Sequence, residues 1–261
     1  MTRVTLDIQD NLALVTLNRP DKMNAVDFEM IDAVIAAGEA LAARDDLRAV
    51  VLQGEGRAFC AGLDVVNFGA LAMGDPEALI MPRTHGAANK FQQFSLVWRD
   101  LPVPVIAALH GVAFGAGFQL ALGADMRIAA PETRLSIMEM KWGLVPDMGG
   151  MATLPHLTRA DVIGRLTYTA DEITAEQGAD WGLVTELNAD PQARALALAQ
   201  SIAGRSPSAI RAAKRLIRKA LTAPEAEVLM TESREQTDLI GKPDQMEVIA
   251  ANLQKRAPQF K

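Results

Sequence analysis

A glycine-rich turn before an apolar run is the first place in the sequence where residue types and spacing suggest chemistry. The segment HGVAFGAGFQLALGADMRIAA spans residues 110–130, and Gln119 is the uncharged polar side chain beside its turn. Glycine-rich turns before helices can hold phosphates, direct backbone amides at an oxyanion, or let two elements pack closely. The surrounding sequence decides among these three uses.

Phosphate, metal and covalent chemistry lack the residues that they require. A dinucleotide-binding turn needs a third glycine where Leu120 stands and an acidic residue at the end of the next strand, and the sequence has neither. The Walker and G-x-S-x-G patterns are absent, and the three histidines lack metal-ligand spacing, so we expect no metal. Cys60 has no evident base partner, which favours a packing role over a nucleophilic one.

Backbone N–H groups that could stabilise an oxyanion remain to be considered. A strand that turns into a helix leaves the first helical N–H groups unpaired, and the helix dipole favours negative charge there. A second loop with small residues, RAFCAGLDV at residues 57–65, follows the apolar strand AVVLQG. One amide from each loop would form a two-donor oxyanion hole for a thioester carbonyl. Either loop alone is equally compatible with glycines kept for tight packing, and the two together favour the oxyanion hole.

Alternating strand and helix patterns must position these loops, and they predict a layered α/β fold with ligands at the loops after the strands. Asp27 is expected to cap the first helix. Residues 66–83, rich in Gly, Met and Pro, predict a loop or frayed helix. The predicted strands cover residues 4–8 and 12–18 (a hairpin with its turn at 9–11), 48–54, 103–109 and 126–129, and the predicted helices cover 27–44 and 85–100.

Helical patterns dominate after residue 153. We expect helices over residues 160–167, 191–204, 207–220 and from 224 onward, with GLVTEL as the one strong strand. This change divides the chain into an α/β core at 1–190 and a helical oligomerisation region at 191–261. The basic helix SAIRAAKRLIRKA has its apolar residues on one stripe, which favours a solvated basic face over polyanion binding.

Composition excludes several classes of partner. The 261 residues are 49% hydrophobic and 22% charged with a net charge of −6, so bulk electrostatics suggest neither nucleic acid nor an anionic membrane. Residues 103–124 carry no charge but contain Pro104, His110, Gln119 and four glycines, which favours buried core over a membrane span. The lone cysteine and an N-terminus without an apolar core predict a mature, cytoplasmic protein.

The sequence resembles the crotonase superfamily, the enoyl-CoA hydratase/isomerase family, over essentially its whole length. The resemblance is carried by LNRPDKMNAV, GRAFCAGLDV, LPVPVIAALHGVAFGAGFQLALGADMRIAA, MKWGLVPDMGG and KRAPQF in this order. It implies an α/β core of crotonase-like ββα superhelical turns with a C-terminal helical region. It also implies an acyl-CoA substrate, with coenzyme A as part of the substrate and no separate cofactor. The amides implied for the oxyanion hole are those of Ala61 and Ala116.

The resemblance also implies which carboxylates transfer protons. Hydratases of the family use two glutamates; the second corresponds to Glu139, and the first to Gln119. An amide cannot ionise, so Gln119 can orient water or substrate but cannot serve as a base. The dienoyl-CoA isomerase branch adds an acidic residue that corresponds to Asp147, but it too is acidic where Gln119 stands. Asp147 has an alternative use as the N-cap of a helix that begins near Met148.

The resemblance further implies a coenzyme A site and an assembly. Arg19 and Lys22 lie where the family meets the nucleotide, although a solvated turn charge is equally compatible with Lys22. Trimers or pairs of trimers are implied, so we expect a homotrimer or a dimer of trimers. The other residues implied to contact coenzyme A are Ala25, Cys60, Ala61, Gly62, Leu63, Asp64 and, near the C-terminus, Lys255, Phe260 and Lys261.

The preferred expectation is therefore an isomerase/hydratase for unsaturated acyl-CoA thioesters that works through a stabilised enolate, with isomerisation favoured. Glu139, assisted by Asp147, would move the proton. One alternative is hydration with Glu139 as the single acid and base and Gln119 orienting water. Another is a catalytically weak coenzyme A-binding scaffold that keeps the loops and the oligomer.

Overall fold

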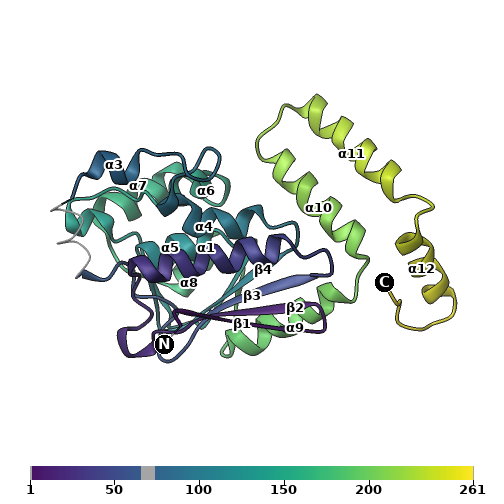
Figure 1. Ribbon diagram of the computed structural model, residues 1–261, viewed down its shortest axis with the longest axis horizontal. Coiled ribbons are helices and arrows are strands. Elements are labelled where there is room, and N and C mark those ends of the chain that lie inside the picture. Colours follow the sequence, from purple (N-terminus) through teal and green to yellow (C-terminus); the bar gives the residue numbers. More distant parts are fainter. Residues whose placement is uncertain (1, 66–73, 261) are drawn as a thin grey trace.

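Two β-sheets and a set of covering helices form the fold of the computed structural model, which describes residues 2–65 and 74–260 (Figure 1). The mixed α/β class that we expected is confirmed. The larger sheet has the order β1-β2-β3-β4-β6-β9, and the smaller has the order β5-β7-β8. The strands of the larger sheet are β1 (Val4–Gln9), β2 (Leu12–Leu17), β3 (Ala49–Gly54), β4 (Val105–Leu109), β6 (Met126–Ala129) and β9 (Glu186–Leu187).

The hairpin of β1 and β2 starts the large sheet. The two strands are antiparallel, with Gln9 opposite Leu12, and both turn residues, Asp10 and Asn11, have positive φ angles of 49° and 65°. Asp and Asn tolerate this region better than most residues, which is why the turn forms here. The later strands are parallel, so their carboxyl ends meet at one edge. The small sheet consists of β5 (Val112–Phe114), β7 (Arg134–Ser136) and β8 (Ile173–Thr174).

Helices α1 (Phe28–Ala42), α4 (Lys90–Asp100) and α5 (Ala116–Leu122) cover one face of the large sheet (Figure 1). Asp27 caps α1 as predicted, accepting a hydrogen bond from Met30 N at 2.8 Å. Helix α4 begins five residues later than the predicted start at residue 85. Its N-cap is Asn89, which forms a reciprocal capping box with Gln92.

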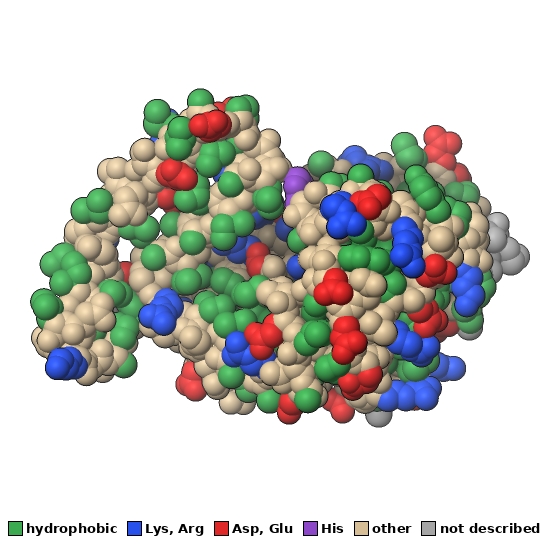
Figure 2. All heavy atoms as spheres, turned by 180° about the vertical axis from the view of Figure 1, so that it is seen from behind, with side chains coloured by type: hydrophobic (Ala, Val, Ile, Leu, Met, Phe, Trp, Pro, Cys, Tyr) green, Lys and Arg blue, Asp and Glu red, His purple; other side chains and the backbone are tan. Residues whose placement is uncertain are grey.

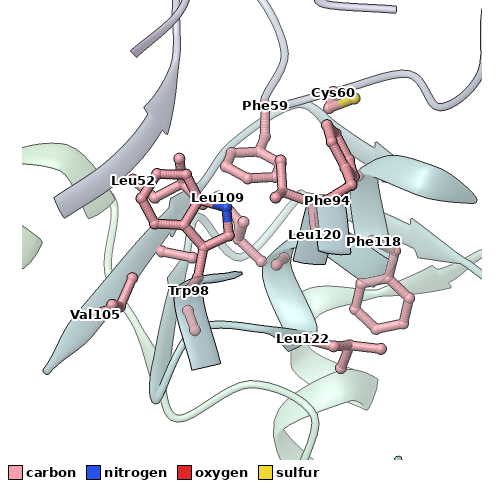
Figure 3. Close-up of a cluster of buried hydrophobic side chains, with 14 of the residues drawn as sticks. Leu52, Phe59, Cys60, Phe94, Trp98, Val105, Leu109, Phe118, Leu120 and Leu122 are labelled. Carbon is pink, nitrogen blue, oxygen red and sulfur yellow. The ribbon is translucent and has the colours of Figure 1, made fainter. Parts of the chain in front are cut away.

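The main hydrophobic core lies between these helices and the sheet. Figure 3 shows Trp98 and Phe94 of α4 facing Phe59, with Phe118 of α5 lower in the same cluster. All four side chains are fully buried. Alternate residues of β3 and β4 point to the opposite face, where Val51 and Ile106 pack with two alanines of α9 (Pro191–Ala203). The sheet is therefore covered on both sides, as a mainly parallel sheet requires.

The uncharged run at residues 103–124 is buried core, as expected. It forms β4, β5 and α5, and every residue of α5 is buried. Among the described residues, no helix is long and apolar enough to cross a membrane.

The remaining helices follow the small sheet and the C-terminal part of the chain. Helix α9 lies on the core sheet, whereas α10, α11 and α12 extend away from it, with α11 beside α10 (Figure 1). The remaining elements of the described residues are the 3-10 turns at Pro20–Lys22, Glu139–Trp142 and Leu154–His156, and the helices α3 (Pro76–Ile80), α6 (Gly150–Thr153), α7 (Ala160–Thr169), α8 (Ala175–Asp180), α10 (Pro207–Ala220), α11 (Glu225–Leu239) and α12 (Pro243–Leu253).

The basic side chains of α10 correct one expectation. We expected a solvated basic face, but Lys214 is buried and contacts Asp125 at 2.7 Å and the Val103 carbonyl at 2.8 Å. Arg211 donates to backbone carbonyls in the turn after α1, among them that of Asp45. Lys214 and Arg211 thus fasten α10 to the core, whereas Arg215 stays 57% exposed and pairs with Glu235 of α11.

The stretch at residues 66–83 was expected to be a loop or frayed helix. Residues 66–73 lie outside the described residues. In the remainder, Asp75 caps the short helix α3 by accepting hydrogen bonds from the Glu77 and Ala78 amides.

Candidate active site

The glycine turn between β5 and α5 presents a free backbone donor. Gly115 is the N-cap of α5 and has a φ of +49°, which favours glycine. Ala116 is the first residue of the helix, so its N–H has no intrahelical acceptor. Among the described residues, no hydrogen bond from this N–H to another group is found. The Ala116 N–H is thus not engaged by the described part of the protein, which is the condition that an oxyanion donor at this position requires.

The second loop, residues 55–64, lies directly against this turn. Cys60 pairs with the β5 residue Ala113: its N–H donates to the Val112 carbonyl, and its carbonyl accepts from Phe114 N, both at 3.0 Å. A Cβ on Gly117 would lie 2.6 Å from the Cys60 Cβ, and one on Gly62 would lie 2.8 Å from the Phe114 oxygen. Both glycines therefore permit close packing, and that packing brings the two loops together.

The donor predicted at Ala61 must be corrected. The Ala61 N–H donates to the Met23 carbonyl at 2.9 Å and is therefore engaged. Leu63 forms a parallel bridge with Val26, in which the neighbours of Leu63 make the hydrogen bonds: Val26 N donates to the Gly62 oxygen, and Asp64 N donates to the Val26 oxygen. The N–H of Leu63 points away from Val26, and no acceptor for it exists among the described residues.

Gln119 lies at the centre of a hydrogen-bond network on α5. Its side chain is buried, and its Oε1 accepts from the backbone amides of Met148 and Gly150 at 2.9 and 3.0 Å. Two donors on one oxygen fix the orientation of the amide, so the Nε2 points the other way. It donates to Oε1 of Glu139 at 2.5 Å. Gln119 therefore positions both the Glu139 carboxylate and the segment that carries Asp147.

Glu139 begins a 3-10 turn and is partly buried beside Gly115. Its second oxygen, Oε2, is buried and has no hydrogen-bond partner among the described residues. Burial raises the pKa of Glu139, and the nearby negative charge of Asp147 adds to the increase. A partly desolvated carboxylate with one unpartnered oxygen is a stronger base than a solvated one.

Asp147 is not a helix cap. Helix α6 begins at Gly150 with Gly149 as its N-cap, and no side chain caps it. The Asp147 carboxylate keeps a large accessible surface because it faces a cavity, yet protein surrounds it on the other sides, and this burial raises its pKa. The two carboxylates expected to transfer protons are thus close enough for their charges to interact.

Several residues predicted to contact coenzyme A serve the fold instead. Arg19 donates to the Ala25 carbonyl at 2.9 Å and pairs with Asp64 at 2.8 Å, so its guanidinium is not free for a phosphate. The Cys60 side chain is fully buried and donates to the Asn24 carbonyl, and burial raises the pKa of its thiol to about 12. The expectation that Cys60 packs rather than reacts is confirmed, whereas its side chain cannot reach a substrate.

The other predicted contacts are spread over two regions. Lys22 is exposed near the two loops, and no ion pair of its side chain is found among the described residues. Phe260 stacks against Arg48, with 5.4 Å between the guanidinium carbon and the ring centre, at the end of the sheet opposite the loops. Lys255 follows α12 and is exposed. Lys255 and Phe260 therefore do not reach the site of their own chain, and Lys261 lies outside the described residues.

Asn24 is a site residue that sequence reasoning missed. It is fully buried with a φ of +56°, and its Nδ2 donates to the carbonyls of Glu55, Ala58 and Phe59 at 3.0, 2.9 and 3.1 Å. It thereby holds the loop that ends at Leu63. Asparagine tolerates a positive φ better than most residues, and this property of Asn24 was the one clue in the sequence to its role.

Comparisons with known proteins find relatives over nearly the whole chain. A sequence model of the family described as "Enoyl-CoA hydratase/isomerase" matches residues 7–261. A probable enoyl-CoA hydratase of Rhodobacter capsulatus is 36% identical over 265 residues, covering 98% of this chain and 97% of the relative. The 1,2-epoxyphenylacetyl-CoA isomerase of Escherichia coli is 34% identical, covering 97% and 96%.

Solved structures show the same fold. The crystal structure of a putative enoyl-CoA hydratase from Streptomyces coelicolor superimposes with a TM-score of 0.90 at 35% identity, covering 99% of this chain and 94% of that one. The relatives bear names of different reactions, so the identity of the reaction rests on the side chains of the site.

Proposed function

The chain belongs to the enoyl-CoA hydratase/isomerase family, and we propose that it moves a double bond within an unsaturated acyl-CoA thioester rather than hydrating one. The observation that carries this proposal is the contact of the Gln119 amide with Glu139 at 2.5 Å. An amide cannot ionise, so the site holds Glu139 and Asp147 as its acid and base groups.

The first step is removal of a proton from the carbon next to the thioester. This proton is too weakly acidic for an unaided carboxylate, so the enolate oxygen needs stabilisation. The amides of Ala116 and Leu63 supply two donors on adjoining loops, and each well-placed donor contributes about 3 kcal/mol to transition-state stabilisation. The dipole of α5 adds positive potential at the same point.

Glu139 accepts that proton and returns it to the far carbon of the original double bond. The carbon–hydrogen bond breaks, the double bond shifts into conjugation with the thioester, and a new carbon–hydrogen bond forms. No atoms are gained or lost. Asp147, on a separate element, can protonate the distal end of a longer conjugated system, as the charge coupling between the two carboxylates suggests.

Gln119 is poorly placed for hydration. Its oxygen is saturated by two backbone donors, and its nitrogen already donates to Glu139. A hydratase must deliver both a hydroxide equivalent and a proton to the substrate. With Glu139 as the one ionisable side chain of the Gln119–Glu139 pair, and with Asp147 on a separate element, the geometry supports proton shuttling better than addition of water.

Replacing Gln119 by glutamate should create hydratase activity. One carboxylate oxygen would accept from the Met148 and Gly150 amides, and the other would face Glu139. Two carboxylates this close raise at least one pKa and leave a protonated acid beside a base. We expect the Gln119→Glu protein to remove the absorbance of a short 2-enoyl-CoA faster than the unaltered protein at matched concentration.

Gln119→Met is the matched control, because it keeps the length but supplies no carboxylate. It should gain no hydratase activity. If the unaltered protein already hydrates rapidly and Gln119→Glu changes nothing, Gln119 does not discriminate between the reactions, and the preference for isomerisation is wrong.

As the pH is lowered, isomerase activity should be lost at a higher pH than it would be if the base were an ordinary, solvated glutamate. Glu139 acts as a base only when ionised, and burial raises its pKa. Because the Asp147 charge adds to that increase, Asp147→Asn should move the acid limb of the kcat/KM profile to lower pH. The kcat/KM profiles of the unaltered and Asp147→Asn proteins with a 3-enoyl-CoA measure this shift. An acid limb that Asp147→Asn leaves in place would contradict the coupling.

We also propose that the C-terminal helices mediate self-association. In the single chain, α11 has no buried residue, and Leu253 of α12 is 81% exposed. Figure 2 shows a hollow beside the C-terminal helices, and a cavity of about 890 Å³ lies between α10 and the core, lined by apolar side chains such as Leu122 and Ile217. Apolar surface on this scale favours burial against another copy.

Sedimentation velocity should therefore show trimers or hexamers at micromolar concentration. Because α9 packs on its own sheet, we place the contacts after residue 203. Charged substitutions at Leu229 and Met230, both about half exposed, should shift the distribution toward smaller species. A clean monomer for the unaltered protein would refute the proposed assembly.

A further inference from the structure

A cavity beyond Asp147 is not explained by the reaction itself. Its volume is about 590 Å³, within the range of small-molecule sites, and it lies between α4 and the segment 146–152. Asp147 belongs both to this cavity and to the catalytic pair, since its charge reaches Glu139. The carbonyl end of an acyl group bound at the oxyanion loops would direct its distal end past the two carboxylates into this space.

The α4 wall of the cavity carries two glutamines. The Oε1 of Gln92 accepts from Asn89 N at 2.9 Å and from Arg83 Nη1 at 3.2 Å, which directs its Nε2 away from both donors. Gln93 is half-buried, and no hydrogen bond of its side chain is found among the described residues. The cavity thus offers hydrogen-bonding groups that the protein itself leaves unused, and a purely alkyl group would leave them unsatisfied.

The charges around the cavity favour a neutral group over an anionic one. Arg99 pairs with Asp100 at 3.3 Å, and Arg218 contacts the same carboxylate at 2.9 Å. His85 contacts Thr84 through Nδ1 and Glu39 through Nε2. Among the described residues, no cation pairs with the Asp147 carboxylate, which would repel a second carboxylate.

We propose that this cavity selects acyl groups that carry a neutral oxygen-bearing substituent, such as a hydroxyl or oxo group, beyond the unsaturated carbons. The proposal rests on the proposed acyl-CoA function, and it names Gln93 as the residue that determines specificity. A neutral hydroxyl or oxo oxygen can accept from the Gln93 amide, and this is the hydrogen bond on which the preference depends; a hydroxyl can in addition donate to Asp147. An unsubstituted alkyl chain satisfies none of these groups.

Binding of saturated acyl-CoA thioesters, which cannot isomerise, tests the proposal without catalysis. Calorimetric dissociation constants would be compared for alkyl, ω-hydroxy and ω-carboxy acyl-CoA probes of equal length over a series of medium chain lengths. At the best length we expect the hydroxy probe to bind roughly five- to ten-fold more tightly than the alkyl probe, as one gained hydrogen bond gives. The carboxy probe should bind more weakly than the hydroxy probe.

Two variants locate the effect. Gln93→Leu should abolish the preference for the hydroxy probe, whereas Gln200→Leu, at an exposed position of α9, should retain it. Asp147→Asn should improve binding of the carboxy probe. Equal or tighter binding of the alkyl probe at every length, or a preference that survives Gln93→Leu, would overturn the inference. Failure of the proposed function would differ: the probes would bind in this order, but no 3-enoyl-CoA would be converted.

Discussion

Glu139→Gln should lower isomerase turnover by roughly 100- to 10,000-fold, the range for loss of a positioned acid or base. Glutamine keeps the shape of the side chain, and its oxygen can still accept from Gln119 Nε2. Only the ability to ionise is lost. The effect should fall on kcat, because Glu139 is not among the residues proposed to hold coenzyme A. The rise in conjugated thioester absorbance during conversion of a 3-enoyl-CoA measures this loss of kcat.

The same substitution should stabilise the folded protein at neutral pH. The pKa of Glu139 is raised on folding, so the charged form is disfavoured in the folded state, and this cost is present above the raised pKa. Glutamine removes the charge and hence the cost, so Tm should rise. Glu132→Gln, at an exposed position, is the control and should change neither quantity. Near-normal turnover in a folded Glu139→Gln protein would eliminate Glu139 as the base.

Ala116→Pro should reduce turnover by roughly 100-fold or more, because it removes one oxyanion donor. The position suits the test. Ala116 is the first residue of α5, where proline is well tolerated because this N–H has no intrahelical partner. The cost to the helix is therefore small compared with the loss of the donor.

Ala116→Gly keeps the amide while removing the side chain, and it should retain most of the activity. Comparing Ala116→Pro with Ala116→Gly separates the effect of losing the N–H from the effect of losing the methyl group. Circular dichroism and sedimentation would confirm that both proteins fold alike. If the folded Ala116→Pro protein turns over at a near-normal rate, this amide does not stabilise the transition state.

Local signals in the sequence predicted much of the fold. The Asp-Asn turn, the Asp27 cap and the prolines at the starts of α9 and α10 each act within a few residues, so they can be recognised without knowledge of the tertiary structure. The strands β5, β7 and β8 were not predicted because two or three residues carry no usable periodicity.

The donor that we propose in the second loop lies two residues from the one predicted, and the difference has a physical cause. Whether Ala61 or Leu63 offers a free N–H depends on the segment 23–26, which pairs with this loop from a distant part of the chain. The same holds for Arg19, whose partner Asp64 is forty-five positions away. The segment NRPDKMN supplies charges that suggest phosphate binding, but tertiary contacts decide which of those charges stay free.

The most direct test of isomerisation over hydration is the absorbance of the conjugated enoyl thioester, recorded for the unaltered protein with a 3-enoyl-CoA and, separately, with a 2-enoyl-CoA of the same length. We predict that absorbance rises with the first substrate, as the double bond moves into conjugation, and stays nearly constant with the second. Rapid loss of absorbance with the 2-enoyl-CoA, and no rise with the 3-enoyl-CoA, would show that the site hydrates and would contradict the proposed role of Gln119.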